Sequence, residues 1–414
     1  MRIRMIKLQI VLGVVAMLCL PPPASAVGVG NNTRAFVAGE VMVKLNSGVD
    51  VRAFATANKL NDNPGGIEQL ANHPIYRLQI LDGSSPPDKA ADLSKNQQVI
   101  YAEPDYYGEI PEARRRSSWT VGDNLGLTDY MEQWAVSTIG LPEAHMVTRG
   151  ASVTIAVLDT GVDMDHPALR GHLLNGYDFV DSDADPSEAG VEGPDSAFGH
   201  GTHVAGLLAL VAPDAKILPV RFLAPDGTGT NWRQAQALNY AASHGADIIN
   251  LSYSSDGDSR LIDDILAKIT CNSAFYDKCR SKDRPGAVIV AAAGNSGAQV
   301  REYPAASTVP GVLASAASTE SDRLASFSTY GPWIQLEAPG DRILSCFPGG
   351  RYALWSGTSM AAPLAAGTAA LVRAVYPTLK PTAVVTQMRS TAASVGGPVR
   401  WRLNAAGAID PRDR

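Results

Sequence analysis

Three side chains in separate parts of the sequence could together cleave an amide bond. Asp159 ends an apolar run, His200 opens an apolar helical pattern, and Ser359 lies in the first turn of a helix of small residues. A serine hydroxyl is a poor nucleophile at neutral pH, so it needs an imidazole base within hydrogen-bonding distance. The imidazole in turn needs a carboxylate that fixes its tautomer. This combination predicts an enzyme that works by nucleophilic catalysis.

Each of these segments also has a simpler interpretation when it is considered alone. Asp159 is compatible with an ordinary turn, and Ser359 with a helix N-cap. His200 and His203 are compatible with helix capping or a pair of metal ligands, but no further His or Cys cluster in the sequence completes a metal site. Asn295, which follows an apolar run, adds an amide that could donate to an oxyanion. With all four groups present, we predict an acyl-transfer site and give His203 no catalytic role.

Residues 133–409 resemble the subtilisin-like serine protease family (subtilases, peptidase S8). The motifs Asp-Thr-Gly, Gly-His-Gly-Thr-His, Ala-Ala-Gly-Asn and Gly-Thr-Ser-Met-Ala carry the resemblance, and they follow one another in the family's order. It implies that Ser359 is the nucleophile and that His200 is the general base and acid. It also implies that Asp159 orients the histidine, and that Asn295 binds the oxyanion together with the backbone N–H of Ser359.

The resemblance further implies a set of substrate-binding residues. Ser252, Tyr253 and Ser254 match the edge segment on which an extended substrate binds as an added β-strand. Gly294 belongs to the same predicted cleft. Glu302 precedes a Tyr-Pro pair, and the family's residue at this place lines the floor of the pocket for the side chain before the cut bond. The expected partners are protein or peptide substrates.

The carboxylate of Glu302 predicts a preference for Lys or Arg before the cut bond, because a buried charge is costly unless it is paired. The chain itself offers such a sequence in Arg114-Arg115-Arg116. Two alternatives stay open at this stage. Either Arg301 neutralises the glutamate, or the glutamate points into water, as loop glutamates usually do.

The alternation of patterns along the chain predicts the fold class. A length of 414 residues with 45% hydrophobic content allows two or three folded units. Beyond residue 150, short apolar runs alternate with helical patterns, which is typical of a parallel sheet covered by helices. We predict an α/β fold with a doubly wound, mostly parallel, subtilisin-like sheet, preceded by a small α+β propeptide domain. The predicted strands are Val153–Leu158, Lys216–Val220, Asp247–Leu251, Ala287–Ala293 and Val312–Ala316, and helices are expected to begin near His200, Thr230, Thr358 and Pro381.

The N-terminal residues 1–26 have the pattern of a secretory signal peptide. Basic residues precede an apolar run over residues 8–20, and an Ala-Ser-Ala sequence ends at Ala26. The alternative is a membrane anchor, but the run is shorter than the ~20 residues that span a bilayer. We therefore expect a secreted protein, extracellular or periplasmic, that is free of the membrane after the leader is removed.

The segment Ala38–Asp105 resembles the inhibitory propeptide of the same family, most clearly over residues 99–105. The resemblance implies a domain that docks on the enzyme, assists the folding of its parallel sheet and blocks the active site until it is cut away. We expect the propeptide and its cleavable linker at 27–116, the catalytic domain at 117–414, and the maturing cut within 111–120. The predicted propeptide strands are Glu40–Leu45, Ile75–Leu81 and Gln98–Tyr101, and the predicted helices are Val49–Leu60 and Asp88–Lys95.

An acidic loop that contains Asp178, Asp181 and Asp183 resembles a calcium loop of the thermitase branch, because its oxygen ligands alternate at a spacing that suits a hard cation. We therefore expect a structural calcium there, and no cofactor for the chemistry. The alternative is a solvated acidic loop. A different calcium loop of many subtilisins is missing, since Leu207–Leu210 runs directly into the following Ala-Pro turn.

Three cysteines remain if Cys19 leaves with the leader. Cys271 and Cys279 are close in sequence, and export to an oxidising compartment favours a disulfide between them. Cys346 is then expected to be a buried free thiol.

The net charge excludes one class of function, and two other functions compete with the protease. A formal charge of −6 from 35 basic and 41 acidic residues excludes the strong positive field of a nucleic-acid-binding protein. Two other functions compete with the protease: a catalytically idle family member that binds peptides, and a serine esterase. The esterase is disfavoured because Ser359 is not in a Gly-x-Ser-x-Gly motif. We expect a monomer.

Overall fold

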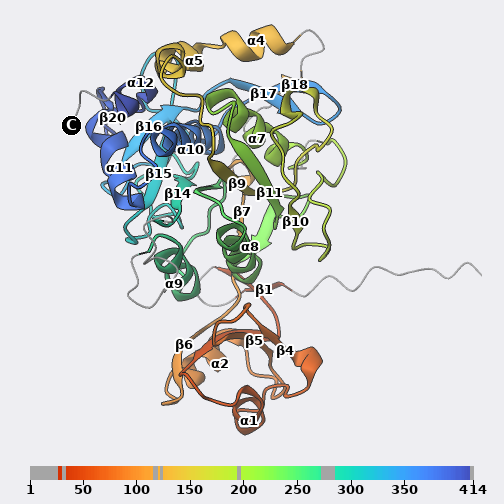
Figure 1. Ribbon diagram of the computed structural model, residues 1–414. Helices are drawn as coiled ribbons and strands as arrows, with labels where there is room; N and C mark the ends of the chain where they lie inside the picture. Colours follow the sequence, from red (N-terminus) through yellow and green to blue (C-terminus); the bar gives the residue numbers. More distant parts are fainter. Residues whose placement is uncertain are drawn as a thin grey trace, which may run out of the picture.

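The computed structural model describes residues 27–29, 34–114, 120–121, 125–193, 197–271 and 285–410. The predicted leader, residues 1–26, lies outside this range. Figure 1 shows a small N-terminal unit, coloured orange, next to a larger unit that contains the rest of the chain.

The N-terminal unit is a four-stranded antiparallel sheet with two helices. Its strands are β3 (Glu40–Leu45), β4 (Ile67–Gln69), β5 (Ile75–Gln79) and β6 (Val99–Glu103), and its helices are α1 (Val51–Ala57) and α2 (Pro86–Leu93). The strand order is β4-β5-β3-β6, so β3 is central. Alternate residues of β3, Val41 and Val43, pack with Phe54 and Leu93 of the helices in one apolar core. These elements confirm the predicted α+β arrangement.

A nine-stranded sheet forms the centre of the larger unit. Its strands are β9 (Thr154–Asp159), β10 (Tyr177–Asp178), β11 (Lys216–Arg221), β13 (Ile248–Leu251), β14 (Val288–Ala292), β15 (Val312–Ser318), β16 (Leu336–Pro339), β19 (Ala393–Ser394) and β20 (Trp401–Arg402). The order is β10-β11-β9-β13-β14-β15-β16-β20-β19, and every pair is parallel except β19 with β20. The chain proceeds from β9 to β11 on one side and to β13 on the other. This reversal opens a crevice at the carboxyl end of β9, where Asp159 lies.

Helices cover both faces of this sheet. The main helices are α7 (His200–Val211), α8 (Asn231–Ser243), α9 (Arg260–Ile269), α10 (Thr358–Val375), α11 (Pro381–Ser390) and α12 (Ala405–Ile409). One apolar core unites α7, α10, α11 and α12 with one face of the sheet, and a second core unites α8 and α9 with the other. The doubly wound α/β class is therefore confirmed.

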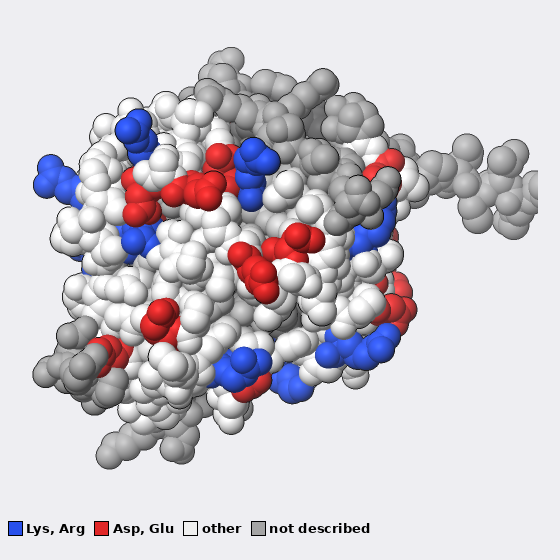
Figure 2. All heavy atoms as spheres, turned by 90° about the horizontal axis from the view of Figure 1, so that it is seen from above, with Lys and Arg blue, Asp and Glu red and all other residues white. Residues whose placement is uncertain are grey.

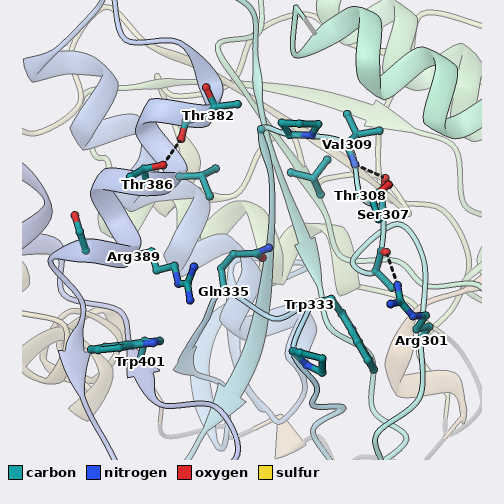
Figure 3. Close-up of a pocket in the computed structure, with 17 residues that line it drawn as sticks. Arg301, Ser307, Thr308, Val309, Trp333, Gln335, Thr382, Thr386, Arg389 and Trp401 are labelled. Atoms are coloured by element: carbon teal, nitrogen blue, oxygen red, sulfur yellow. Dashed lines mark hydrogen bonds between the residues drawn. The ribbon is translucent and has the colours of Figure 1, made fainter.

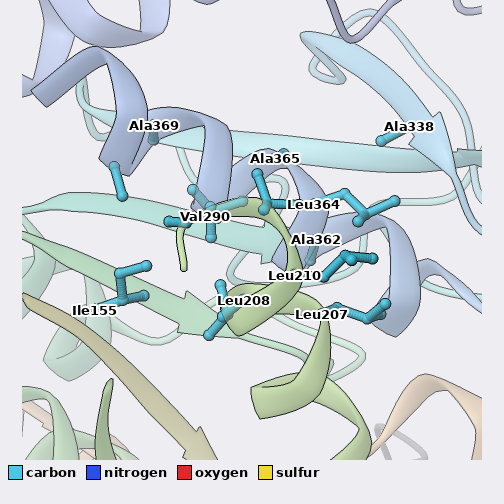
Figure 4. Close-up of a cluster of buried hydrophobic side chains, with 14 of the residues drawn as sticks. Ile155, Leu207, Leu208, Leu210, Val290, Ala338, Ala362, Leu364, Ala365 and Ala369 are labelled. Carbon is cyan, nitrogen blue, oxygen red and sulfur yellow. The ribbon is translucent and has the colours of Figure 1, made fainter. Parts of the chain in front are cut away.

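The helices α7 and α10 are buried on all sides and pack against each other (Figure 4). Leu207 and Leu208 of α7 and Ala362 and Ala365 of α10 belong to the apolar core that the two helices share with the sheet. The helix α10 is long and apolar enough to span a membrane by length and composition, but 89% of it is buried within the fold. The helix α10 is therefore the core helix of this unit.

Smaller elements complete the described part of the chain. The strands are β1 (Val27–Val29), β2 (Ala35–Val37), β7 (Tyr107–Glu109), β8 (Thr120–Val121), β12 (Thr228–Thr230), β17 (Ile343–Phe347) and β18 (Arg351–Trp355). The helices are α3 (Pro111–Arg114), α4 (Leu127–Glu132), α5 (Trp134–Thr138) and α6 (Leu141–His145), with 3-10 turns η1 (Pro64–Gly66) and η2 (Pro167–Leu169). β17 pairs antiparallel with β18, and β7 pairs antiparallel with β12.

The predicted strands and helices lie within one to three residues of the observed ones. The sequence prediction omitted α9, although its apolar residues recur at helical spacing and all face the core: Leu261, Ile262, Ile265, Leu266 and Ile269. It also omitted β16, which lies beside β15 at the centre of the sheet.

Two carboxylates of the N-terminal unit bind the N-termini of two helices in the larger unit. Glu103 accepts hydrogen bonds from the backbone N–H groups of Arg260 (2.9 Å) and Leu261 (3.2 Å) at the start of α9. Asp105 accepts one from the N–H of Trp232 (2.9 Å) at the start of α8. Free N–H groups and the helix dipole make such ends favourable sites for carboxylates. The N-terminal unit is thus attached at the starts of two helices of the larger unit.

We predict that Glu103→Ala weakens the attachment by about 1–3 kcal/mol, because at least two hydrogen bonds from a helix N-terminus to a carboxylate are lost. The measurement is thermal unfolding by circular dichroism of the full-length chain carrying Ser359→Ala, which removes the self-cleavage expected from the sequence. Asp92→Ala is the matched control, because Asp92 forms an exposed ion pair with Lys95 within the N-terminal unit and its loss changes stability little. Equal unfolding midpoints for the two variants would contradict the prediction.

Candidate active site

Asp159 and His200 meet because the start of α7 lies against the end of β9. The Nδ1 atom of His200 lies 2.6 Å from Oδ1 of Asp159, and both side chains are buried. Gly201 makes this approach feasible, since a Cβ atom there would lie 2.0 Å from the carbonyl oxygen of Gly161. The glycine after the histidine is therefore a packing requirement. The geometry supports the predicted pairing of carboxylate and imidazole.

Ser359, at the start of α10, faces the same point but does not donate to His200 in this state. Its Oγ donates to Oε2 of Glu112 at 2.7 Å. The same carboxylate oxygen lies 3.3 Å from Nε2 of His200. Glu112 belongs to α3, which follows the N-terminal unit, and its side chain is buried. The glutamate therefore lies between the two groups that the chemistry requires to exchange a proton.

Asn295 points its amide N–H into the same place. Its Oδ1 accepts from the backbone N–H of Thr358 (3.0 Å) and from the hydroxyl of Thr358 (2.9 Å). A backbone N–H can only donate, so the oxygen of the amide must face Thr358 and the nitrogen must face the site. That nitrogen donates to Oε1 of Glu112 at 3.1 Å. The predicted oxyanion donor is thus oriented by a neighbouring residue, and it holds a carboxylate oxygen.

The charge state of His200 follows from its neighbours. Burial disfavours the charged imidazole, but Asp159 and Glu112 outweigh this effect and raise the pKa of His200 to about 10. Burial also disfavours the charged form of Glu112, yet the hydrogen bond and charge of His200 hold the pKa of that carboxyl below its usual range. At neutral pH the imidazole is therefore protonated between two carboxylates, and it cannot act as a base.

The other groups around the site have supporting positions. His203 is buried, and burial lowers its pKa to about 3, so it stays neutral. Its Nε2 lies 3.0 Å from the carbonyl oxygen of Ala353 in β18, and its lack of a catalytic role stays a prediction. Glu188, which the sequence analysis missed, accepts from the hydroxyls of Thr160 (2.7 Å) and Thr202 (2.8 Å), the residues next to Asp159 and near His200. Burial raises the pKa of Glu188 to about 7.

The chain just before Glu112 lies across the predicted substrate-binding segment as an extended strand. The N–H of Ser254 donates to the carbonyl of Glu109 (2.9 Å), and the N–H of Glu109 donates back (3.0 Å). On its other side, β7 pairs with β12. The Oγ of Ser252 donates to the carbonyl of Ser359 (3.0 Å) and so links the same segment to α10. The edge predicted to receive substrate therefore carries a strand.

Tyr253 limits the room beside this strand. Its side chain is buried, with its ring against Phe222 at 5.3 Å between centroids. A Cβ atom on Gly108, the centre of β7, would lie 2.2 Å from the Tyr253 hydroxyl. The backbone of β7 thus approaches Tyr253 as closely as glycine permits.

Gly294 and Glu302 pack closely against each other next to Asn295. The left-handed backbone of Gly294 (φ +102°) lies against the Glu302 carboxyl group, which a Cβ at Gly294 would approach to 2.1 Å. Glu302 is 1% exposed and accepts from the hydroxyl of Thr329 at 2.6 Å. It does not point into water. The guanidinium of Arg301 instead lies over the ring of Trp333 and donates to the carbonyl of Ala306 (Figure 3).

A buried arginine of β11 lies against the predicted calcium loop. The guanidinium of Arg221 forms ion pairs with Asp178 and, at 2.6 Å, with Asp181. Asp183 instead accepts from the N–H of Asp185. Among the residues that the structure describes, no group of three or more His, Cys, Asp or Glu side chains is placed to hold a metal. The three aspartates do not fit the expected calcium site, because a fixed cation of the protein already neutralises two of them.

The cysteine predictions have different outcomes. Cys346 is a buried free thiol, as expected. Cys279 lies outside the described residues, so its pairing with Cys271 stays a prediction. The Arg-Arg-Arg sequence of the linker also extends beyond the described range.

On the face shown in Figure 2, charged side chains of both signs are mixed. Seen from above, Lys and Arg side chains alternate with Asp and Glu, with uncharged surface between them (Figure 2). A hollow of about 800 Å³ between β15 and α11 contains Arg301 and Trp333 in its lining but none of the predicted catalytic residues. The catalytic crevice itself is filled by β7 and Glu112.

Comparison with known proteins agrees with this geometry. The Subtilase family (peptidase S8) matches residues 150–407, more than half of the chain. The chain belongs to the subtilase family. The fervidolysin N-terminal prodomain matches residues 22–105. This subtilase therefore has an N-terminal prodomain, and it is a subtilisin-like serine protease.

Individual relatives place the chain in the thermitase-like branch. The thermophilic serine proteinase of Bacillus sp. (strain AK1) is 36% identical over 365 residues, which are 85% of this chain and 82% of that protein. Thermitase of Thermoactinomyces vulgaris is 38% identical over 250 residues, 58% of this chain and 81% of that protein. The crystal structure of fervidolysin from Fervidobacterium pennivorans has a TM-score of 0.73 at 24% identity; the match covers 90% of this chain and 61% of that one. That structure shows the fold alone.

We predict that the stability of this protease does not depend on calcium at the acidic loop, because Arg221 supplies the positive charge there. The thermal midpoint should be the same with and without a chelator. Arg221→Ala leaves the buried carboxylate of Asp178 unpaired and should cost roughly 3 kcal/mol. Arg149→Ala removes a half-exposed ion pair with Asp214 and should cost less than about 1 kcal/mol. A fall of the midpoint on chelation that Asp181→Asn abolishes would contradict this prediction.

Proposed function

We propose that Asp159, His200, Ser359 and Asn295 hydrolyse peptide bonds through an acyl-enzyme. The observation that supports this most directly is the convergence of three groups on one carboxylate. The hydroxyl of Ser359, the amide of Asn295 and the imidazole of His200 all contact Glu112. Its two oxygens stand in for the oxygens of a tetrahedral acyl intermediate, so the same donors are in place for a developing oxyanion.

The proposed mechanism begins when Glu112 leaves the site. His200, then neutral and oriented by Asp159, accepts the proton of Ser359 as the hydroxyl attacks the scissile carbonyl carbon. Asn295 and the backbone N–H of Ser359 donate to the oxyanion. The imidazolium gives its proton to the leaving amine, and the acyl-enzyme is hydrolysed by a water that His200 activates. No cofactor is required in these steps.

We further propose that the protein is exported and matures as a zymogen that processes itself. In this proposal residues 1–26 are the signal peptide, 27–116 the inhibitory and chaperone propeptide, and 117–414 the catalytic domain, with a Cys271–Cys279 disulfide. The protein is then secreted as a monomer. The attachment of the N-terminal unit to α8 and α9, and the strand β7 on the substrate edge, support the inhibitory role. Slow folding of a parallel sheet gives such a domain its chaperone role.

Two other functions lead to different outcomes in one experiment. An idle peptide-binding protein has no activated serine, and an esterase has one but does not cleave proteins. We expect a serine-directed phosphonate to label the natural mature chain, and casein to be cleaved. We expect Ser359→Ala to remain unlabelled and to accumulate as uncut precursor. Labelling with ester turnover only would favour the esterase, absence of labelling would favour the binder, and normal maturation of Ser359→Ala would mean that another protease makes the cut.

The proposed substrate preference depends on Glu302. Its burial and its contact with Gly294, the residue before Asn295, support a carboxylate at the floor of the pocket for the side chain before the cut bond. The direction of Arg301 toward Trp333 argues against the alternative in which Arg301 neutralises the glutamate. A Lys or Arg side chain would bring the charge that a desolvated carboxylate favours. We therefore propose cleavage after basic residues.

We predict that matched peptides with Arg before the cut bond have a kcat/KM about ten- to hundredfold higher than those with Leu or Phe. Glu302→Gln keeps the shape of the side chain but removes its charge, so it should abolish this ratio while cleavage after Leu changes little. Arg301→Gln is the matched control and should leave the ratio unchanged. The preference is refuted if the natural enzyme cleaves after Leu or Phe as well as after Arg.

A further inference from the structure

We propose that Glu112 is the inhibitory residue of the precursor: its side-chain carboxylate blocks the oxyanion site, and the bond before it is left uncut. This inference rests on the proposed function, since it names the group that keeps that site inactive. It also places the maturing cut on the C-terminal side of Glu112.

The path of the chain is substrate-like only up to Ile110. Glu109 pairs with Ser254, and the N–H of Ile110 donates to the carbonyl of Gly227 at 3.0 Å, so both residues lie on the extended substrate path. At Pro111 the chain turns into α3. A serine can attack only a peptide carbonyl that is held in line between nucleophile and oxyanion donors. Here those donors hold the Glu112 carboxylate instead of a backbone carbonyl.

A carboxylate in this place is not a substrate. Its carbon already carries two oxygens that share a negative charge, so nucleophilic attack on it is strongly disfavoured. It is nevertheless a good ligand, because it accepts hydrogen bonds from Ser359 (2.7 Å) and Asn295 (3.1 Å) and lies 3.3 Å from His200. Hydrogen bonds to a charged acceptor are stronger than those to a neutral one. Glu112 thus binds as a product acid would, without a bond to be cut.

The same contact also disables the catalytic base. The imidazole of His200, held between Asp159 and Glu112, keeps its proton at neutral pH. A protonated imidazole cannot accept the proton of Ser359. Glu112 therefore blocks the reaction in two ways: it occupies the oxyanion site, and it stabilises the inactive charge state of the histidine.

The site is shaped so that this carboxylate fits. Gly357, which precedes the start of α10, lies directly against Glu112, and a Cβ atom there would come within 1.7 Å of Oε1. The side chain of Glu112 is only 5% exposed, so water cannot compete freely for its oxygens. A buried carboxylate without donors is costly. The Glu112 carboxylate is stabilised here by the catalytic groups Ser359, Asn295 and His200.

The test is the rate at which a fluorescent serine-directed phosphonate labels Ser359 in the uncut precursor, which is separated from the mature chain by size. The full-length natural chain and Glu132→Gln should be labelled slowly, because Glu132 is an exposed glutamate on α4 outside the site. Glu112→Gln should be labelled about tenfold faster, and Glu112→Ala about a hundredfold faster, as charged hydrogen bonds are lost. Equal rates for all four precursors would overturn the proposal.

Two further readouts separate inhibition from a purely structural role. In the Ser359→Ala precursor, the ¹⁵N resonances of His200 should titrate near pH 10, and Glu112→Gln should lower that pKa. An unchanged pKa would contradict the proposed contact. The intact mass of the mature chain should be the same for the natural chain and Glu112→Ala, because residue 112 leaves with the propeptide. A mature-chain mass that changes by the Glu-to-Ala difference would place the cut before Glu112. This result would overturn the proposed position of the maturing cut.

These outcomes are distinct from a failure of the proposed function. If the mature natural chain is not labelled, the serine is not activated and the protease mechanism itself is wrong. If the mature chain is labelled and the precursor rates do not depend on Glu112, only the inhibitory role of Glu112 is wrong.

Discussion

The close packing of α7 against α10 is the constraint on which the site depends. His200 begins one helix and Ser359 lies in the first turn of the other, so their relative position is set by how closely the two helices approach. Gly367 of α10 allows this approach, since a Cβ atom there would lie 2.6 Å from Val211 of α7. Protein interiors are packed too densely to absorb such an overlap without movement. The small residues of α10 therefore serve catalysis through packing, far from the reacting atoms.

The N-terminal prodomain contacts the face of the sheet opposite this helix pair. A parallel sheet brings together strands that are distant in sequence, and such pairing is slow to form. Glu103 and Asp105 bind the N-termini of α9 and α8, two helices on the face of the sheet opposite α7 and α10. The prodomain thus contacts one face, while the segment that follows it reaches through β7 into the crevice. The proposed assistance of folding and the proposed inhibition therefore involve one continuous segment.

The sequence predicted the parts of this structure that depend on local patterns. Asp159, His200, Asn295 and Ser359 each lie at the end of an apolar strand or the start of a helix, and the structure places them there. The sequence also predicted where the large strands lie along the chain, because each is a short run of apolar residues. The helix α9 had a clear amphipathic pattern and was omitted nonetheless.

The parts that escaped prediction depend on contacts between distant segments. Glu112 contacts Ser359, a residue 247 positions away, and nothing in the sequence around Glu112 distinguishes it from an exposed linker glutamate. Arg221 ends a strand whose partner β10 carries Asp178, so the arginine that pairs with two aspartates of the acidic loop lies in an apolar run of the sequence. In both cases the sequence shows a charged residue, but only the fold shows which residue it contacts.

The two buried glutamates of the catalytic crevice show how the environment decides what a carboxylate does. Glu112 accepts hydrogen bonds from Ser359 and Asn295 and lies next to the imidazole of His200. It is therefore held as an anion at the place of the reacting acyl group. Glu302 accepts from the hydroxyl of Thr329 and lies against the glycine before Asn295, and we have proposed it for the floor of the neighbouring pocket. In that proposal an acidic side chain binds at the reacting centre and a basic one beside it. If both proposals hold, the inhibitory side chain and the preferred substrate side chain differ in charge, and the propeptide blocks the reacting groups without occupying the pocket proposed to select substrates.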